Sequence, residues 1–113
     1  MTMRLTEFKE VRHIEHPLYP EFDEGDKLEN GVIYIVDGAL KDGMQRIQYN
    51  CPCGCGNTVM IAFVREGQYK RETPAWAYRE KEGKVTLSPS VFSTGLPCRS
   101  HYFIRENRIS WCG

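Results

Sequence analysis

The chain has 113 residues, 41% of them hydrophobic, and fifteen basic side chains balance fifteen acidic ones. This length suits one hydrophobic core and excludes two, and no apolar run approaches the ~20 residues that a membrane-spanning helix needs. A neutral chain has no overall field that would attract nucleic acid or anionic lipid. We therefore expect a single domain over residues 1–113 that has neither nucleic acid nor membrane among its partners.

The first half of the sequence predicts strands separated by turns. Residues 3–14 are expected to form a strand and residues 15–27 a loop, because the second stretch is rich in Pro, Asp, Glu and Gly. Asn30-Gly31 predicts a turn, and the β-branched run at 32–36 predicts a buried strand after it.

Further strands are expected over 44–50 and 58–64, on either side of a cysteine-rich segment, with a polar loop over 67–74. Two hairpins should follow, with strands at 76–79, 84–88, 101–105 and 108–112. No stretch repeats apolar residues at a 3.6-residue period over a dozen positions. The expected fold class is therefore mostly β, a small β-sheet fold with little helix.

Five cysteines are many for a chain of this length, and Cys51, Cys53 and Cys55 lie too close together to be cross-linked with one another. The first residues lack the continuous apolar stretch of a secretory signal, which favours a cytoplasmic localisation. In a reducing compartment, clustered thiols indicate a metal site more often than disulfides. The segment Cys-Pro-Cys-Gly-Cys-Gly at 51–56, the cysteine knuckle, also has glycines whose positive φ angles let backbone amides approach thiolate sulfurs.

Zinc takes four ligands at the corners of a tetrahedron, so the knuckle needs a ligand from elsewhere, and Cys98 is the best candidate. One ligand set is Cys51, Cys53, Cys55 and Cys98, and the other combines two knuckle cysteines with Cys98 and His101. We favour the four cysteines, because an extended strand over 98–104 would turn Cys98 and His101 to opposite faces. Four thiolates leave no position for water, so the expected zinc ion is structural. Cys112 is expected to be a spare thiol.

Several motifs together resemble a small bacterial family that was long of unknown function. They are Gly31-Val32-Ile33-Tyr34-Ile35, the knuckle, Val85–Val91, Pro97–Ile104 and Ile109-Ser110-Trp111. Members of that family are encoded beside ubiquitin-like proteins and their E1- and E2-like conjugating enzymes, and the resemblance covers about residues 28–112. It implies a zinc-bound β fold and a serine peptidase that removes a ubiquitin-like modifier from its targets or trims its precursor. Where relatives tend to continue Pro-Ser-Ile with Gly-Asn-Trp, this chain has Val91-Phe92-Ser93.

Ser90 and His101 are the candidate catalytic residues. A serine hydroxyl becomes a good nucleophile when a base takes its proton, and histidine is the usual base near neutral pH. Ser90 follows a proline at the end of an expected strand, and His101 lies eleven residues later, beyond a turn expected at 95–97. Ser88 is a competitor, whereas Ser100 is disfavoured because neighbours on a strand point apart.

A third residue should orient the imidazole. Glu106, Asn107 and several upstream acids have suitable chemistry, and the sequence does not choose among them. Backbone amides near Gly95 are a candidate oxyanion hole. His13 and His16 share a face only on a helix, and we expect them to be exposed histidines without a function.

Three functions are compatible with the sequence. The first is a serine peptidase that acts on a ubiquitin-like modifier and its conjugates. The second is a non-catalytic zinc module that binds the modifier or its conjugating enzymes. The third is a nucleic-acid-binding zinc ribbon, which the zero net charge disfavours.

Overall fold

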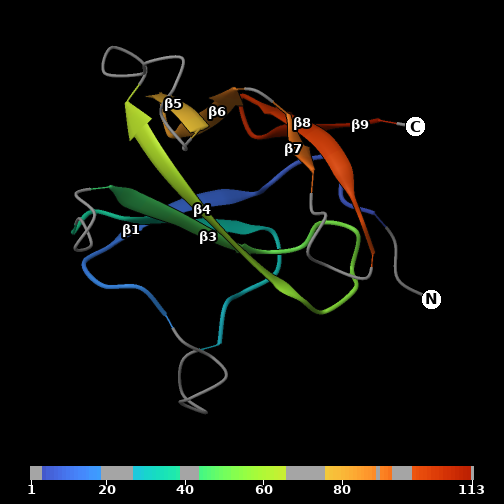
Figure 1. Cartoon of the computed structure of the whole chain (residues 1–113), viewed down its shortest axis with the longest axis horizontal. Helices are drawn as coiled ribbons and strands as arrows, with labels where there is room; N and C mark the ends of the chain where they lie inside the picture. The colour runs from blue at the N-terminus through green and yellow to red at the C-terminus, as the bar shows by residue number, and fades with distance from the viewer. Residues whose placement is uncertain are drawn as a thin grey trace.

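The computed structural model describes residues 4–18, 27–38, 44–65, 76–88, 90–92 and 98–112. Within these residues it contains nine strands in two sheets and no helix (Figure 1), which confirms the mostly-β prediction. The strands are β1 (Glu10–Ile14), β2 (Val32–Val36), β3 (Gln45–Asn50), β4 (Thr58–Arg65), β5 (Trp76–Lys81), β6 (Lys84–Ser88), β7 (Val91–Phe92), β8 (His101–Arg105) and β9 (Arg108–Trp111). No helix in this described part of the chain is long and apolar enough to cross a bilayer.

The larger sheet has the order β1-β2-β3-β4-β5-β6. The pairs β1–β2 and β4–β5 are parallel, and the other pairs are antiparallel. The long strand β4 crosses from β3 to β5 (Figure 1), and β1 packs against β6. The sheet therefore curls until its two outer strands approach each other.

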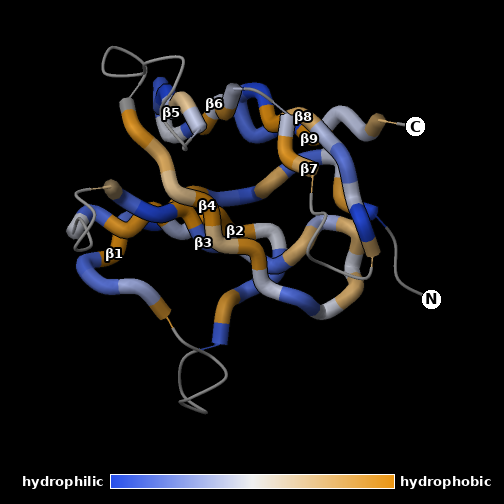
Figure 2. The backbone as a smooth tube through the Cα atoms, in the orientation of Figure 1, coloured by the Kyte–Doolittle hydropathy of each residue, from blue (hydrophilic) through white to orange (hydrophobic). Residues whose placement is uncertain are grey.

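Strand β2 is buried along its whole length, and in Figure 2 its tube is largely hydrophobic. Ile33 and Ile35 belong to the main core. Val32 and Tyr34 point to the other face and pack with Leu28 in a second, smaller cluster. Burial on both faces explains why this strand is a continuous β-branched run and does not alternate with polar residues.

The smaller sheet has the order β7-β8-β9 and is antiparallel. Along β8, Tyr102 and Ile104 are fully buried while His101 and Phe103 are partly exposed. This alternation defines a core face and an outer face. The candidate histidine lies on the outer face.

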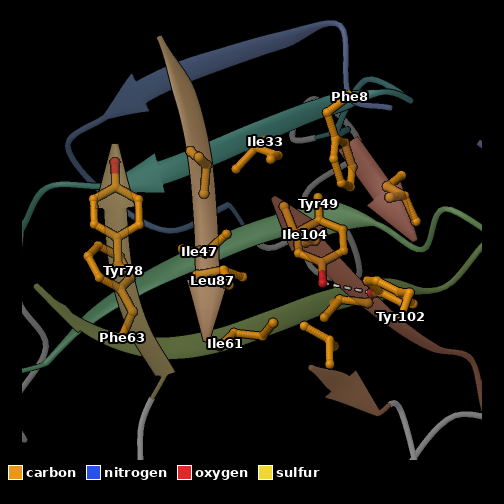
Figure 3. Close-up of a cluster of buried hydrophobic side chains, with 14 of the residues drawn as sticks. Phe8, Ile33, Ile47, Tyr49, Ile61, Phe63, Tyr78, Leu87, Tyr102 and Ile104 are labelled. Carbon is orange, nitrogen blue, oxygen red and sulfur yellow. Dashed lines mark hydrogen bonds between the residues drawn. The ribbon is translucent and has the colours of Figure 1, made fainter. Parts of the chain in front are cut away.

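One core joins the two sheets. A single buried cluster includes Ile47 and Ile61 of the larger sheet and Ile104 of the smaller one (Figure 3). The hydroxyls of Tyr49 on β3 and Tyr102 on β8 meet at 2.7 Å inside this core (Figure 3). Each tyrosine thereby supplies the hydrogen-bond partner that burial of the other requires.

The expected strand over 3–14 is shorter in the structure and begins at Glu10. The residues just before it bond to separate parts of the molecule. The amide of Leu5 donates to Pro52 O at 2.8 Å, and the amide of Phe8 donates to Asn107 O at 2.8 Å. These bonds go to different segments, and the pairing of this stretch with β9 is limited to the isolated bridge between Glu7 and Arg108, so no strand forms here.

The remaining strand predictions agree with the structure to within one or two residues. One strand was not predicted, β7, which has two residues. The loop expected over 67–74 and the turn expected over 95–97 lie outside the described residues.

Candidate active site and metal centre

Strands β7 and β8 bring the two candidate catalytic residues together. Ser90 precedes β7, His101 begins β8, and Ser90 Oγ lies 2.8 Å from His101 Nε2. The side chain of Ser90 is partly buried. A hydroxyl that donates to Nε2 requires the neutral imidazole to carry its proton on Nδ1, which is the tautomer that a general base needs.

The register of the two strands explains this contact. Phe92 pairs with His101 and Val91 with Tyr102, so one further step would set Ser90 opposite Phe103. His101 is then the diagonal neighbour of Ser90 on the same face, a separation that a long side chain can bridge. The pairing thus brings together two residues that are eleven positions apart in the chain.

The ring of His101 is held by aromatic contacts. It stacks on Phe92 with the ring centroids 4.7 Å apart and the planes 12° from parallel. Phe103 lies further away, at 6.5 Å and 30°. Among the described residues, none makes a hydrogen bond with His101 Nδ1, the position at which a triad carboxylate would bind.

Two of the orienting residues considered from the sequence, Glu106 and Asn107, follow the far end of β8. Glu106 lies five positions after His101, which amounts to about 16 Å along a strand. Asn107 is buried, and its Oδ1 accepts a hydrogen bond from the Val85 amide at 2.7 Å. The structure therefore brings Asn107 to β6 and not to the imidazole, and gives it a structural part.

The competing serines are accounted for differently. Ser88 is exposed at the end of β6, where it pairs with Ala77. Ser100 is buried, and its hydroxyl donates to Cys98 Sγ at 3.3 Å. Ser100 thus belongs to the thiol cluster.

Trp76 is a neighbour of Ser90 that the sequence did not indicate. Its indole Nε1–H donates to Ser90 O at 3.2 Å. This bond ties Ser90 to the start of β5. The carbonyl and the hydroxyl of Ser90 are therefore both held by hydrogen bonds.

The four cysteines expected to bind metal converge. The Sγ atoms of Cys51, Cys53, Cys55 and Cys98 all lie within 4.8 Å of one another. His101 does not belong to this group. The expected extension over 98–104 begins only at His101, so a turn carries Cys98 towards the knuckle.

The spacing of the sulfur atoms suits a tetrahedral metal ion. With metal–sulfur bonds of about 2.3 Å, a regular tetrahedron has sulfur–sulfur edges of about 3.8 Å. Cys51 Sγ lies 3.4 Å from Cys53 Sγ and 3.7 Å from Cys98 Sγ. Gly54 and Gly56 have φ angles of 85° and 87°, the positive values expected for the knuckle. The four cysteines could thus hold a metal ion.

Protonation of the thiols differs across the cluster. Hydrogen bonding from the Ser100 hydroxyl, helped by its backbone amide, lowers the pKa of the Cys98 thiol to about 6. Burial raises the pKa of the Cys51 thiol. A metal ion must therefore displace a proton from Cys51 as it binds.

Sequence reasoning named the dyad and the cysteines but missed Phe92, Trp76 and Ser100 as their neighbours. Phe92 lies two residues after Ser90, which is the spacing of side chains on one face of a strand, so that signal was present. The contact from Trp76 joins β5 to the start of β7 and left no local signal. The hydrogen bond from Ser100 to Cys98 depends on the turn at 98–100, where Arg99 has a φ of 47°. The oxyanion hole expected near Gly95 lies outside the described residues.

Comparison with known proteins identifies a family. The family model described as bacterial ubiquitination-like system serine protease (BubE) matches residues 20–112. This range begins eight residues earlier than the resemblance seen in the motifs and includes the knuckle, Ser90 and His101. No curated protein and no solved structure matches the chain.

Proposed function

This chain belongs to the BubE family of bacterial ubiquitination-like system serine proteases, and from that premise we propose that it is a serine peptidase that removes or processes a ubiquitin-like modifier. Ser90 is the proposed nucleophile and His101 the proposed general base. The proposed partners are the modifier, its conjugates and the E1- and E2-like enzymes that attach it. The observation that carries the assignment is the 2.8 Å contact between Ser90 Oγ and His101 Nε2.

Acylation follows from this contact. Ser90 Oγ attacks the scissile carbonyl carbon while its proton passes to His101 Nε2. The tetrahedral intermediate then collapses as the imidazolium returns the proton to the leaving amine. The carbonyl half of the substrate, the modifier's C-terminal residue, stays bound to Ser90 as an ester.

Deacylation repeats the same proton transfer with water. His101 Nε2 takes a proton from the attacking water, and the hydroxyl oxygen adds to the ester carbon. The imidazolium then protonates Ser90 Oγ as it leaves, which releases the modifier with a free carboxylate. One base thus serves both halves of the reaction.

We propose zinc as the ion of the four cysteines, because four soft thiolates in a tetrahedron suit it. A filled coordination shell gives it a structural part and no step in the reaction. Its position matters nonetheless. Cys98 lies three residues before His101, so an ion that fixes Cys98 also fixes the start of β8.

The test is cleavage of a modifier precursor that carries extra residues after its C-terminal tail. Ser90→Ala should abolish cleavage while bound metal and the melting temperature stay unchanged. Ser88→Ala is the matched control, because it removes an exposed hydroxyl two residues away, and it should cleave like wild type.

Cleavage by Ser90→Ala at the wild-type rate would remove Ser90 from the mechanism. Binding of the modifier by the wild-type protein without any cleavage would instead favour the non-catalytic zinc module. Labelling with a fluorophosphonate separates these outcomes, because it requires an activated serine.

A further inference from the structure

Within the described part of the chain, the base of the proposed dyad has no hydrogen-bonded orienting partner on Nδ1. In a Ser-His-Asp triad, a carboxylate on Nδ1 fixes the imidazole and stabilises the imidazolium that forms. Among the described residues no such group reaches His101, and the ring contacts Phe92 and, less closely, Phe103. We propose that Phe92 is a positioning residue that orients His101 for proton transfer with Ser90. The inference rests on the proposed peptidase function.

The geometry suits this task. The rings of Phe92 and His101 are 4.7 Å apart and 12° from parallel, so the phenyl ring covers one face of the imidazole. A contact through the face restricts the plane of the ring but leaves the edge, with both nitrogens, open. Nε2 is therefore free to meet Ser90 Oγ at 2.8 Å.

The backbone sets all three side chains on one surface. Ser90 and Phe92 are two residues apart and share the outer face of the smaller sheet, whereas Val91 between them is buried. Phe92 is the direct cross-strand partner of His101. Directly paired side chains are the closest neighbours across a sheet, so the stack is a consequence of register.

The stack also has an electrostatic effect. The face of an aromatic ring attracts a cation through its quadrupole. His101 becomes an imidazolium only as the proton leaves Ser90, so this attraction is stronger in the transition state than in the substrate complex. Such interactions raise kcat and leave KM unchanged. From the usual strength of a cation–π contact, the increase in kcat should be about threefold to thirtyfold.

The exposure of Phe92 points away from a core function. Its side chain is 46% exposed, and Met60 at 44% is the other large hydrophobic residue exposed in the described part of the chain. An aromatic ring left in water stabilises the fold little. A substitution at Phe92 can therefore change the reaction without unfolding the protein.

The experiment compares Phe92→Leu, Phe92→Tyr and Met60→Leu in zinc-loaded full-length protein, with cleavage of the modifier precursor as the assay. Phe92→Leu keeps an apolar side chain without a π face and should lower kcat about threefold to thirtyfold at unchanged KM. Phe92→Tyr restores the aromatic face and should stay within about twofold of wild type. Met60→Leu controls for the exchange of an exposed large apolar side chain for leucine elsewhere and should have no effect.

A second readout does not depend on turnover. In wild type, the phenyl ring current should shift the ring protons of His101 upfield in the NMR spectrum, and this shift should vanish in Phe92→Leu and persist in Phe92→Tyr.

Equal kcat in wild type and Phe92→Leu would overturn the inference while leaving the peptidase function intact. An effect of Phe92→Leu on KM alone would also overturn it, because that result makes Phe92 a substrate contact. Absence of cleavage by the wild-type protein would overturn the proposed function and this inference with it.

Discussion

Each of the two sheets presents a histidine at the surface, and the partners of the two differ. On β8 of the smaller sheet, His101 Nε2 meets the hydroxyl of Ser90 at 2.8 Å. On β1 of the larger sheet, His13 lies between carboxylates, with Nδ1 3.0 Å from Asp37 and Nε2 2.9 Å from Glu80. One histidine has a nucleophile and no acid among the described residues, and the other has acids and no nucleophile.

This difference shows that a carboxylate partner does not by itself identify a catalytic histidine. Hydrogen bonding to Asp37 raises the pKa of His13, which favours the imidazolium, and an imidazolium cannot accept a proton. The contacts of His13 instead join the end of β2 to β5, across the curl of the larger sheet. His13 is therefore a structural link, whereas the contact of His101 with Ser90 suits the proposed base.

The largest effect should separate the two histidines by activity. His101→Gln removes the general base and should lower kcat/KM for precursor cleavage by about 10²-fold to 10⁴-fold. His13→Gln should stay within about twofold of wild type, because no substrate-activating group touches it. Comparable losses of kcat/KM in both variants would contradict the proposal that His101, and not His13, is the general base.

The next effect concerns the proposed metal site, in which Cys98 lies three residues before His101. Cys51→Ser should abolish stoichiometric zinc binding and lower the melting temperature by more than about 10 °C. The reason is that the free energy of metal binding adds to the stability of the folded state. Cys112→Ser, outside the thiol cluster, should change neither. Elemental analysis and calorimetry measure both, and full zinc occupancy in Cys51→Ser would exclude that thiol as a ligand.

A smaller effect is expected at Ser100, between the metal cluster and the base. Ser100→Ala removes the hydrogen bond to Cys98 and should weaken zinc binding by about tenfold to a hundredfold. Competition with a chromophoric chelator gives the affinity, and Ser110→Ala on the exposed side of β9 is the control. Loss of cleavage in Ser100→Ala at saturating zinc would make Ser100 a competitor for the nucleophile.

The smallest effect is the pH dependence that His13 confers. Its raised pKa means that the folded protein binds the proton more tightly, so the stabilisation is present below the ordinary value of about 6.5 and is lost as the pH rises through the raised value. Because His13 is 42% exposed, the wild type should melt only about 1–3 °C above His13→Gln at pH 5.5. The melting temperatures of the two proteins should coincide at pH 9. A difference that grows with pH would contradict the raised pKa of His13.

Much of the larger sheet could be predicted from the sequence because its signals are local. The β-branched run of β2 and the turn at Gly31, which has a φ of 81°, are visible without any tertiary contact. The segment before β1 could not be predicted, because Leu5 and Phe8 bond to residues roughly fifty and a hundred positions later and a single sequence carries no sign of such pairs.

The candidate site also has features with a local sequence signal and features that depend on tertiary contacts. The knuckle could be predicted because three thiols and two glycines lie within six residues, and the pair of Ser90 and His101 from the chemistry of serine and histidine together with the family resemblance. The stack on Phe92 requires the register of β7 and β8. That register is set by burial of Val91 and Tyr102 in the common core, which only the folded structure shows.

The central claim is that Ser90 is a nucleophile activated by His101. Mass spectrometry of the protein after reaction with a modifier that carries a C-terminal serine-reactive electrophile tests it most directly. The account predicts one adduct, on the peptide that contains Ser90, and a strongly reduced yield in His101→Gln with His13→Gln unaffected. An adduct on Ser88 or Ser100, or a yield that does not depend on His101, would contradict it.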